Sequence, residues 1–263
     1  MICTSMRGTF LFLGTGASAG VPVIGCKCAT CLSTSPKNKR FRPSGLISVG
    51  GTSLLIDIGP DFRSQALQFN VDSVDGLLLT HTHYDHIAGI DEVRVFNIRQ
   101  KKELPCLLSK ESFDELKTRY HYFFNKEGLS AKLDFQVLES DRGMVDFLGV
   151  KIGYCSFTQG GMLVTGFRVG DFAYISDIQK VDDSIFDSLK GVRTLVLSAL
   201  KPEESHFHLS FDEAVGFSNR VGAKNTWLTH VGHFNDHDAL NALLPSGVQV
   251  AYDGLQVEFL CEM

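Results

Sequence analysis

THTHYDHIAG, residues 80–89, is the stretch of this sequence that decides its fold. Six consecutive positions in it hold three histidines and an aspartate: His81, His83, Asp85 and His86. The apolar segment VDGLLL, residues 74–79, comes directly before them and is typical of a β-strand. A solvated histidine-rich turn would not explain four potential ligands at the end of such a strand. Because imidazole and carboxylate suit Zn, Fe or Mn, the pattern predicts a metal site in this loop.

The chain as a whole has the composition of an ordinary globular protein. Of its 263 residues, 44% are hydrophobic and 21% are charged, and the formal net charge is −5. This charge argues against a dedicated nucleic-acid binder, which usually has a basic domain. No linker or repeat divides the sequence, so we expect one domain over residues 1–263 and leave a homodimer open.

We expect a cytoplasmic protein with no membrane segment. No apolar run approaches the roughly 18 residues that a membrane helix needs. The N-terminal run TFLFL, residues 9–13, is too short for a secretion signal and leads directly into a glycine-rich loop. We interpret this run as the first β-strand.

Strand patterns and helix patterns occur in both halves of the chain, which predicts two sheets packed face to face with helices outside. The strand segments are 9–14, 45–51, 53–59, 74–79, 105–109, 150–157, 164–177, 194–200, 225–232 and 249–259. The helix segments are 61–69, 88–102, 111–126, 210–222 and 237–244. Gly50 and Gly51 are expected to turn the hairpin between the second and third strand segments.

The segment T-H-x-H-x-D-H resembles the signature of the metallo-β-lactamase fold. That resemblance implies an α/β protein, an αββα four-layer sandwich with one or two metals at one edge. More closely, LGTGASAGVPVIGCKCATC (13–31), LLIDIGPDFR (54–63) and YISD (174–177) resemble the phosphodiesterase family of the carbon–phosphorus lyase pathway. HLSFDEA (208–214) and LTHVGH (228–233) resemble it as well. The tRNA 3′-processing endonucleases (ribonuclease Z) are more distantly similar.

The resemblance implies two adjacent metal centres. Their ligands would come from separate parts of the chain: His81 and His83 for one metal, Asp85, His86 and His230 for the other, and Asp177 as a bridge. Asp85 is also expected to act in catalysis. From the residues alone, Asp177 and His230 are single polar residues at the ends of apolar strands, where a rigid strand can hold a ligand.

One position departs from the family pattern. The family has a further histidine where this chain reads SFTQGGMLVTGFRVG, so that Gln159 stands in its place. A neutral amide oxygen is a poorer donor than imidazole toward Zn. We therefore expect the centre of His81 and His83 to bind its metal more weakly or to prefer Mn²⁺. A dinuclear site, a mononuclear hydrolytic site and diverted chemistry all stay open. His121, on a predicted helix, is an alternative ligand in place of the missing histidine, but we expect it to be a plain helix-surface residue.

The seven cysteines include a cluster with metal-binding spacing, Cys26-x-Cys28-x₂-Cys31. Three thiolates within six residues fit a closed, tetrahedral zinc site better than a disulfide framework. The family resemblance supplies the fourth ligand as His233, three residues after the last histidine of the active site. Cys26, Cys28, Cys31 and His233 are thus predicted to hold one structural Zn²⁺.

Two more polar residues are expected to complete the pocket. His208 precedes a helix whose N-cap is Ser210, with Glu213 completing a capping box. The family places its general acid or phosphate-binding histidine on this segment, and His208 fits better than His206. Asp57 resembles the buried acid that orients a metal-bound imidazole through its second nitrogen.

These residues predict a metal-dependent hydrolase, most simply a phosphodiesterase, with one or two Zn²⁺ or Mn²⁺ ions in its active site. The negative net charge favours a small or cyclic phosphodiester over a nucleic acid. Two alternatives stay open: a non-hydrolytic relative similar to the pyrroloquinoline quinone biosynthesis protein, or a tRNA 3′-processing endonuclease. We find no basic, glycine-rich insertion that would grip a tRNA.

Overall fold

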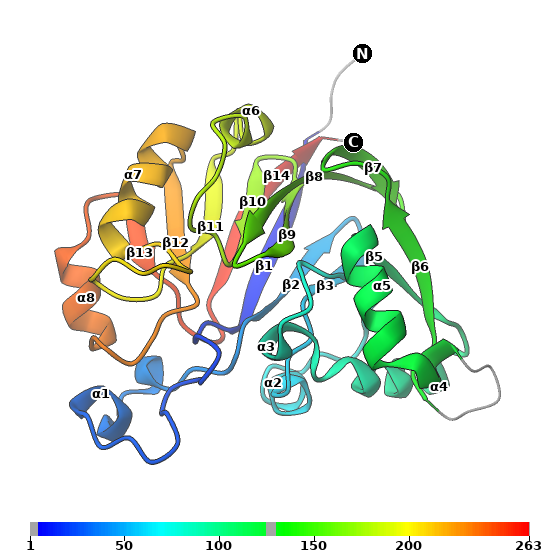
Figure 1. Cartoon of the computed structure of the whole chain (residues 1–263), viewed down its shortest axis with the longest axis horizontal. Coiled ribbons are helices and arrows are strands. Elements are labelled where there is room, and N and C mark those ends of the chain that lie inside the picture. Colours follow the sequence, from blue (N-terminus) through cyan, green and yellow to red (C-terminus); the bar gives the residue numbers. More distant parts are fainter. Residues whose placement is uncertain (1–4, 125–129, 263) are drawn as a thin grey trace.

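Two seven-stranded β-sheets pack face to face in the computed structural model of the chain, which describes residues 5–124 and 130–262. Helices lie on the outer faces of both sheets (Figure 1). The predicted αββα four-layer arrangement is confirmed. Residues 125 and 126, the last two of the helix predicted over 111–126, lie outside the described residues.

The first sheet has the strand order β14-β1-β2-β3-β4-β5-β6. Its strands are β1 (Ser5–Gly14), β2 (Ser44–Val49), β3 (Thr52–Ile56), β4 (Gly76–Leu78), β5 (Leu104–Ser109), β6 (Leu133–Leu138) and β14 (Gln256–Glu262). Strands β14, β1, β2 and β3 pair antiparallel, and β3 to β6 pair parallel. The hairpin predicted at Gly50 and Gly51 joins β2 to β3.

The second sheet repeats this arrangement with the order β13-β12-β11-β10-β9-β8-β7. Its strands are β7 (Arg142–Phe147), β8 (Val150–Gln159), β9 (Met162–Val169), β10 (Phe172–Ile175), β11 (Thr194–Ser198), β12 (Asn225–Thr229) and β13 (Val248–Val250). Strands β10 to β13 are parallel and β7 to β10 antiparallel. Parallel strands end at the same edge of a sheet, so loops from both sheets can meet there.

Helices lie on the outer faces of the two sheets and within the segments that connect the strands. They are α1 (Ala29–Leu32), α2 (Phe62–Gln68), α3 (Tyr84–Ile87), α4 (Arg94–Gln100), α5 (Lys110–Arg119), α6 (Ile185–Ser188), α7 (Phe211–Val221) and α8 (His237–Leu243). Three 3₁₀ turns lie at Pro36–Asn38, Ile90–Val93 and His121–Phe124. The segments predicted as helices at 88–102 and 111–126 are therefore shorter α-helices joined to 3₁₀ turns. None of the helices among the described residues is long and apolar enough to cross a membrane.

The core between the sheets is aromatic. Phe10 and Phe12 of β1 are buried, with ring centroids 4.8 Å apart. Phe10 also packs on Phe172 of β10 at 4.9 Å and on Tyr174 at 5.7 Å. Such ring contacts add to the burial of apolar area. This core fixes the two sheets to each other, and with them the loops at their common edge.

Candidate metal centre

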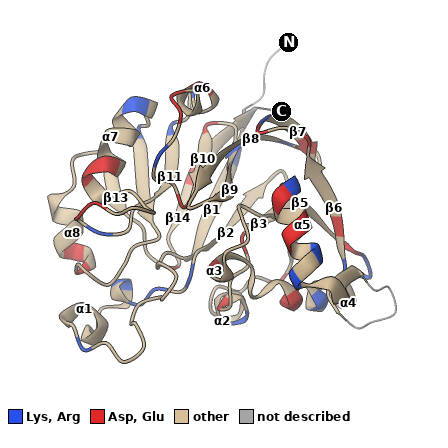
Figure 2. Cartoon of the chain, viewed as in Figure 1, with Lys and Arg blue, Asp and Glu red and all other residues tan. Residues whose placement is uncertain are grey.

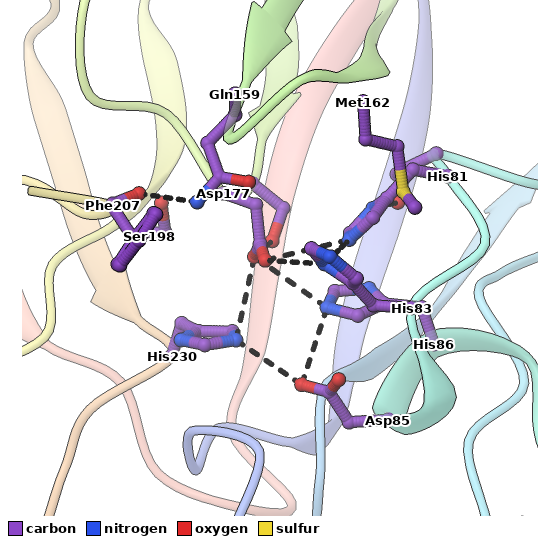
Figure 3. Close-up of polar contacts among 12 residues, drawn as sticks. His81, His83, Asp85, His86, Gln159, Met162, Asp177, Ser198, Phe207 and His230 are labelled. Atoms are coloured by element: carbon purple, nitrogen blue, oxygen red, sulfur yellow. Dashed lines mark hydrogen bonds and ion pairs between the residues drawn. The ribbon is translucent and has the colours of Figure 1, made fainter.

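The predicted ligands come together at one edge of the sandwich. His81 and His83 lie in the loop after β4, and Asp85 and His86 lie in the following helix α3. Asp177 follows β10, and His230 directly follows β12. Figure 3 shows the side chains from both sheets pointing toward one another. Residues 145 positions apart in the chain, Asp85 and His230, thereby come within 3.3 Å.

Three of the strand ends at this edge have a left-handed backbone conformation. Asp57 after β3 has φ of 57°, Asp177 after β10 has φ of 50°, and His230 after β12 has φ of 59°. Non-glycine residues rarely adopt positive φ, and such residues concentrate at functional sites. The local strain turns each side chain into the space between the sheets. All three are buried there.

Four side chains form the tighter of two ligand clusters. Nε2 of His230 lies 3.3 Å from Asp85 Oδ2 and 3.3 Å from Asp177 Oδ1. Nε2 of His86 lies 3.5 Å from the same two oxygens. Ligands at the usual Zn–N and Zn–O lengths in tetrahedral geometry would be about 3.4 Å apart. The four N–O distances agree with this spacing, and ligand atoms of Asp85, His86 and His230 also lie within 4.8 Å of one another.

The second cluster shares Asp177 and is more open. The other carboxylate oxygen of Asp177, Oδ2, lies 3.4 Å from His81 Nε2 and 3.8 Å from His83 Nδ1. The two ring nitrogens are 2.8 Å apart. The two oxygens of Asp177 thus face different clusters, as a bridging carboxylate would. The side chain of His83 is 42% exposed, which leaves this cluster accessible to solvent.

The side chains around His86 include buried carboxylates, whose negative charge a bound cation would balance. Its Nδ1 lies 2.6 Å from Oδ2 of Asp57, which is the contact that the predicted orienting role of Asp57 requires. Burial disfavours a charged ring, but Asp177, Asp57 and Asp85 together raise the pKa of His86 well above its usual value. Three carboxylates this close need a compensating positive charge, which a divalent cation supplies. The residues present therefore fit a metal.

Gln159, the departure from the family pattern, is buried at the end of β8 with 5% of its surface exposed. Its Nε2 donates a hydrogen bond to the carbonyl oxygen of Phe207 at 2.6 Å. Its Oε1 is buried and has no hydrogen-bond partner among the described residues. In Figure 3 this amide points toward Asp177 and the ligand clusters.

The two histidines of the 201–209 loop have different surroundings. The ring of His208 stacks on His230 with centroids 4.7 Å apart. One of its ring nitrogens lies within 4.8 Å of a ring nitrogen of His230 and of a carboxylate oxygen of Asp177. Burial and the neighbouring His230 lower the pKa of His208 to about 4. His206 is exposed, and His121 is exposed in a 3₁₀ turn, as expected of a surface residue.

Ser210 and Glu213 form the predicted capping box at the start of α7, directly after this loop. The Ser210 hydroxyl accepts from the Glu213 amide, and the Glu213 carboxylate accepts from the Ser210 amide. This cap fixes the point at which the loop that carries His208 joins the helix.

The predicted structural site is also assembled. Nδ1 of His233 lies 3.3 Å from Cys26 Sγ, 3.5 Å from Cys28 Sγ and 3.4 Å from Cys31 Sγ. Tetrahedral zinc with ordinary Zn–S and Zn–N lengths would place them about 3.5 Å apart. The backbone N–H of Cys31 donates to Cys28 Sγ and is the main cause that lowers the pKa of Cys28 to about 6. A thiolate is thus favoured at Cys28, whereas burial raises the pKa of the neighbouring Cys31 to about 11.

Sequence reasoning missed the residues that support the ligand loop. The hydroxyl of Thr80 donates to Asp57 and lies 2.9 Å from His81 Nδ1. Arg119 at the end of α5 donates to the carbonyl oxygen of Thr82 at 2.8 Å. Thr80 could have been found from its place at the end of a strand before the histidines. No pattern in the sequence connects Arg119 to this loop.

A family model described as a beta-lactamase superfamily domain matches residues 52–231. The octanoyltransferase of Porphyromonas gingivalis (strain ATCC BAA-308 / W83) is 31% identical over 250 residues, which are 94% of this chain and 50% of that protein. The ribonuclease Z of Methanopyrus kandleri is 35% identical over 81 residues, 30% of this chain and 23% of that protein. This chain therefore spans half or less of these relatives.

Among solved structures, a diphosphatase of the PhnP family is similar over the full length. The match covers 99% of this chain and 100% of the diphosphatase chain, with a TM-score of 0.92 and 33% sequence identity. The similarity includes both sheets and the edge at which the ligand clusters lie.

Proposed function

This chain belongs to the beta-lactamase superfamily, and from this premise we propose that it is a metal-dependent hydrolase that cleaves a small or cyclic phosphodiester. One observation carries the proposal. Asp85, His86, Asp177 and His230 present four ligand atoms at mutual N–O distances of 3.3 to 3.5 Å beside a second, solvent-accessible cluster. Such an arrangement is suited to activating water next to a phosphoryl group.

In this proposal Asp85, His86, Asp177 and His230 hold one divalent cation. His81, His83 and Asp177, with the oxygen of Gln159, hold a second one. Zn²⁺ or Mn²⁺ fits nitrogen and oxygen donors of this kind. Bound cations would supply Lewis acidity, which lowers the pKa of water toward neutrality and offsets charge on the phosphoryl oxygens.

His208 is the residue that we assign to the leaving group. Its ring stacks on His230, and Nδ1 is buried without a hydrogen-bond partner among the described residues. Its pKa of about 4 makes the ring neutral at pH 7, with one N–H to donate. A hydrogen bond from this N–H to the departing oxygen becomes stronger as negative charge grows there, which lowers the barrier.

The net charge of the chain and its similarity to a diphosphatase limit the classes of substrate that we propose. Lys and Arg positions are interspersed with Asp and Glu positions along the described chain (Figure 2), and the net charge is −5. This supports a small substrate over a polynucleotide. The similarity to a diphosphatase favours a second candidate, a diphosphate ester cleaved between its two phosphorus atoms. Both candidates use the same site.

Hydrolysis assays with defined metals test the proposal. We expect the metal-free protein to be inactive. Added Mn²⁺ or Zn²⁺ should restore cleavage of bis-p-nitrophenyl phosphate. It should also restore cleavage of one of two natural substrate classes, either cyclic nucleotides or dinucleoside diphosphates. The matched control is Asp85→Asn, which keeps the side-chain shape but weakens a ligand. Cleavage of a precursor tRNA at its 3′ end would favour the endonuclease instead. Full metal occupancy without hydrolysis of any ester would favour the non-hydrolytic alternative.

A further inference from the structure

Gln159 holds the loop that carries His208 through one hydrogen bond. Its side chain comes from the last residue of β8, in the second sheet. The amide nitrogen reaches the Phe207 carbonyl, one residue before His208, at 2.6 Å. The amide oxygen stays buried without a donor among the described residues. A buried acceptor left without a partner is costly, and a cation would satisfy it.

The chemistry of the Phe207 carbonyl fixes the orientation of this amide. A carbonyl oxygen only accepts hydrogen bonds, so the nitrogen of Gln159 must face it. The oxygen of Gln159, on the other branch of the planar amide, must then point away from Phe207. Figure 3 shows the nitrogen turned toward Phe207 and the oxygen on the side of Asp177. Gln159 therefore presents an oxygen, and not a nitrogen, to the ligand clusters.

A second glutamine, Gln179, holds the same loop, and its Oε1 is likewise buried without a hydrogen-bond partner among the described residues. Nε2 of Gln179 donates to the carbonyl oxygen of Ser205 at 3.1 Å. The loop then joins the sheet through the Leu209 N–H, which donates to the Ile178 carbonyl at 3.1 Å. Gln159 and Gln179 thus hold alternate carbonyls of one short segment. Only Gln159 is assigned to the metal site, which makes Gln179 a matched control.

We propose that Gln159 is a positioning residue that couples occupancy of the second metal centre to the order of the His208 loop. Its oxygen binds the cation that His81, His83 and Asp177 share, and its N–H holds the Phe207 carbonyl. Because the ligand is an amide oxygen, this centre selects an oxygen-preferring cation such as Mn²⁺ over Zn²⁺. The inference rests on the metal site of the proposed function, but it makes a separate statement about one residue.

Metal content and hydrogen exchange test the coupling without a substrate. The wild type should bind two Mn²⁺ per chain outside the cysteine cluster. Gln159→Met should retain only one, and exchange of the Leu209 amide should become about fivefold faster, as expected for the loss of one hydrogen bond. Gln159→Glu keeps an oxygen but loses the donor, so it should retain two Mn²⁺ and show the faster exchange. Gln179→Met should change exchange alone.

Gln159→His is a second variant that should change the metal preference and keep the loop in place. It tests the inference even if Gln159→Met fails to fold. Its imidazole can hold Phe207 and offer nitrogen, so Leu209 exchange should stay slow while Zn²⁺ displaces Mn²⁺ at this centre. A Gln159→Met protein with two Mn²⁺, or with unchanged Leu209 exchange, would overturn the inference and leave the proposed function intact. A wild type that binds no divalent cation at these clusters would overturn the proposed function itself.

Discussion

At the scale of single residues, His208 and His206 show how two side chains on one loop can differ in role. His208 stacks on His230, whereas His206 is exposed. We expect His208→Ala to slow hydrolysis of esters with poor leaving groups about 100-fold or more, because a positioned donor to the leaving oxygen is lost. Activated p-nitrophenyl esters should slow much less. The measurement is kcat/KM for both ester types, with His206→Ala as the control.

Equal losses on both ester types would show that His208 does not assist the leaving group. An effect of the same size in His206→Ala would point to the loop as a whole instead of one ring.

The surroundings of His237 predict how the free energy of unfolding changes with pH. Its Nδ1 faces the guanidinium of Arg40 at 3.0 Å, and burial together with Arg40 lowers the pKa of His237 to about 4. In the unfolded chain this pKa is about 6.5, so between these values only the unfolded state takes up the proton. The free energy of unfolding should therefore fall by roughly 1–3 kcal/mol as pH drops through this window.

Urea unfolding at pH 7 and at pH 4.5 measures this effect. His237→Gln, which can still accept from Arg40, should lose less stability over the window than the wild type. Zinc release in acid affects both proteins and cancels in the comparison. An equal fall in both proteins would show that His237 is not the group responsible.

Much of the site could be predicted at this scale because histidine, aspartate and cysteine are common metal ligands, and several of them lie close together in the sequence. The sequence alone identified His81, His83, Asp85 and His86, and the structure brings them to Asp177 and His230. The hydrogen bond between Gln159 and Phe207 could not be predicted, since it joins residues 48 positions apart that only the folded sheet brings together.

At the scale of elements, helix α5 supports two walls of the site. Glu111 in its first turn accepts from the backbone N–H of Leu163 at 2.8 Å, at the start of β9. Arg119 at its other end donates to the Thr82 carbonyl between the two histidines, at 2.8 Å. The helix therefore fixes the ligand loop relative to the hairpin that carries Gln159.

We expect Arg119→Ala to weaken metal binding at the centre of His81 and His83 by about tenfold, as loss of an outer support typically does. The centre of Asp85 and His230 should be nearly unaffected. Competition with a chelator measures both affinities. Lys117→Ala on the same helix, also an exposed cation, is the control. Equal weakening in both variants would indicate a general effect of charge.

Many of the elements could be predicted from the sequence pattern. Most central strands and α7 agree with it within a few residues. The segment predicted as one strand at 164–177 is instead two strands, β9 and β10, and the segment at 249–259 is divided between β13 and β14 of different sheets. Strands β6 and β7 were missed. The segment LDFQVL of β6 alternates apolar and polar residues and could have been found, whereas β7 has four exposed residues among its six. The four-residue helices α1 and α6 are too short to show a helical period.

At the scale of the whole molecule, the cysteine cluster links distant ends of the chain. His233, which lies just after β12, is 202 to 207 positions away from the three cysteines of the N-terminal loop. The same loop is held by Arg40, which donates to Thr15 and to the carbonyl oxygen of Ala251. The wall of the pocket that carries His230 is thus joined to the start of the chain.

Removal of the metal from this cluster should therefore affect both stability and the active site. A cation that closes so long a loop restricts the unfolded chain, and we expect Cys31→Ser to lower the free energy of unfolding by several kcal/mol. Because His233 lies three residues from His230, the affinity for the active-site metal should also fall. Thermal unfolding and elemental analysis of the wild type and Cys31→Ser, each with and without added Zn²⁺, measure both effects. If Zn²⁺ stabilises the wild type and the variant equally, the cysteine cluster is not the structural metal site, because Cys31→Ser should have lost that response.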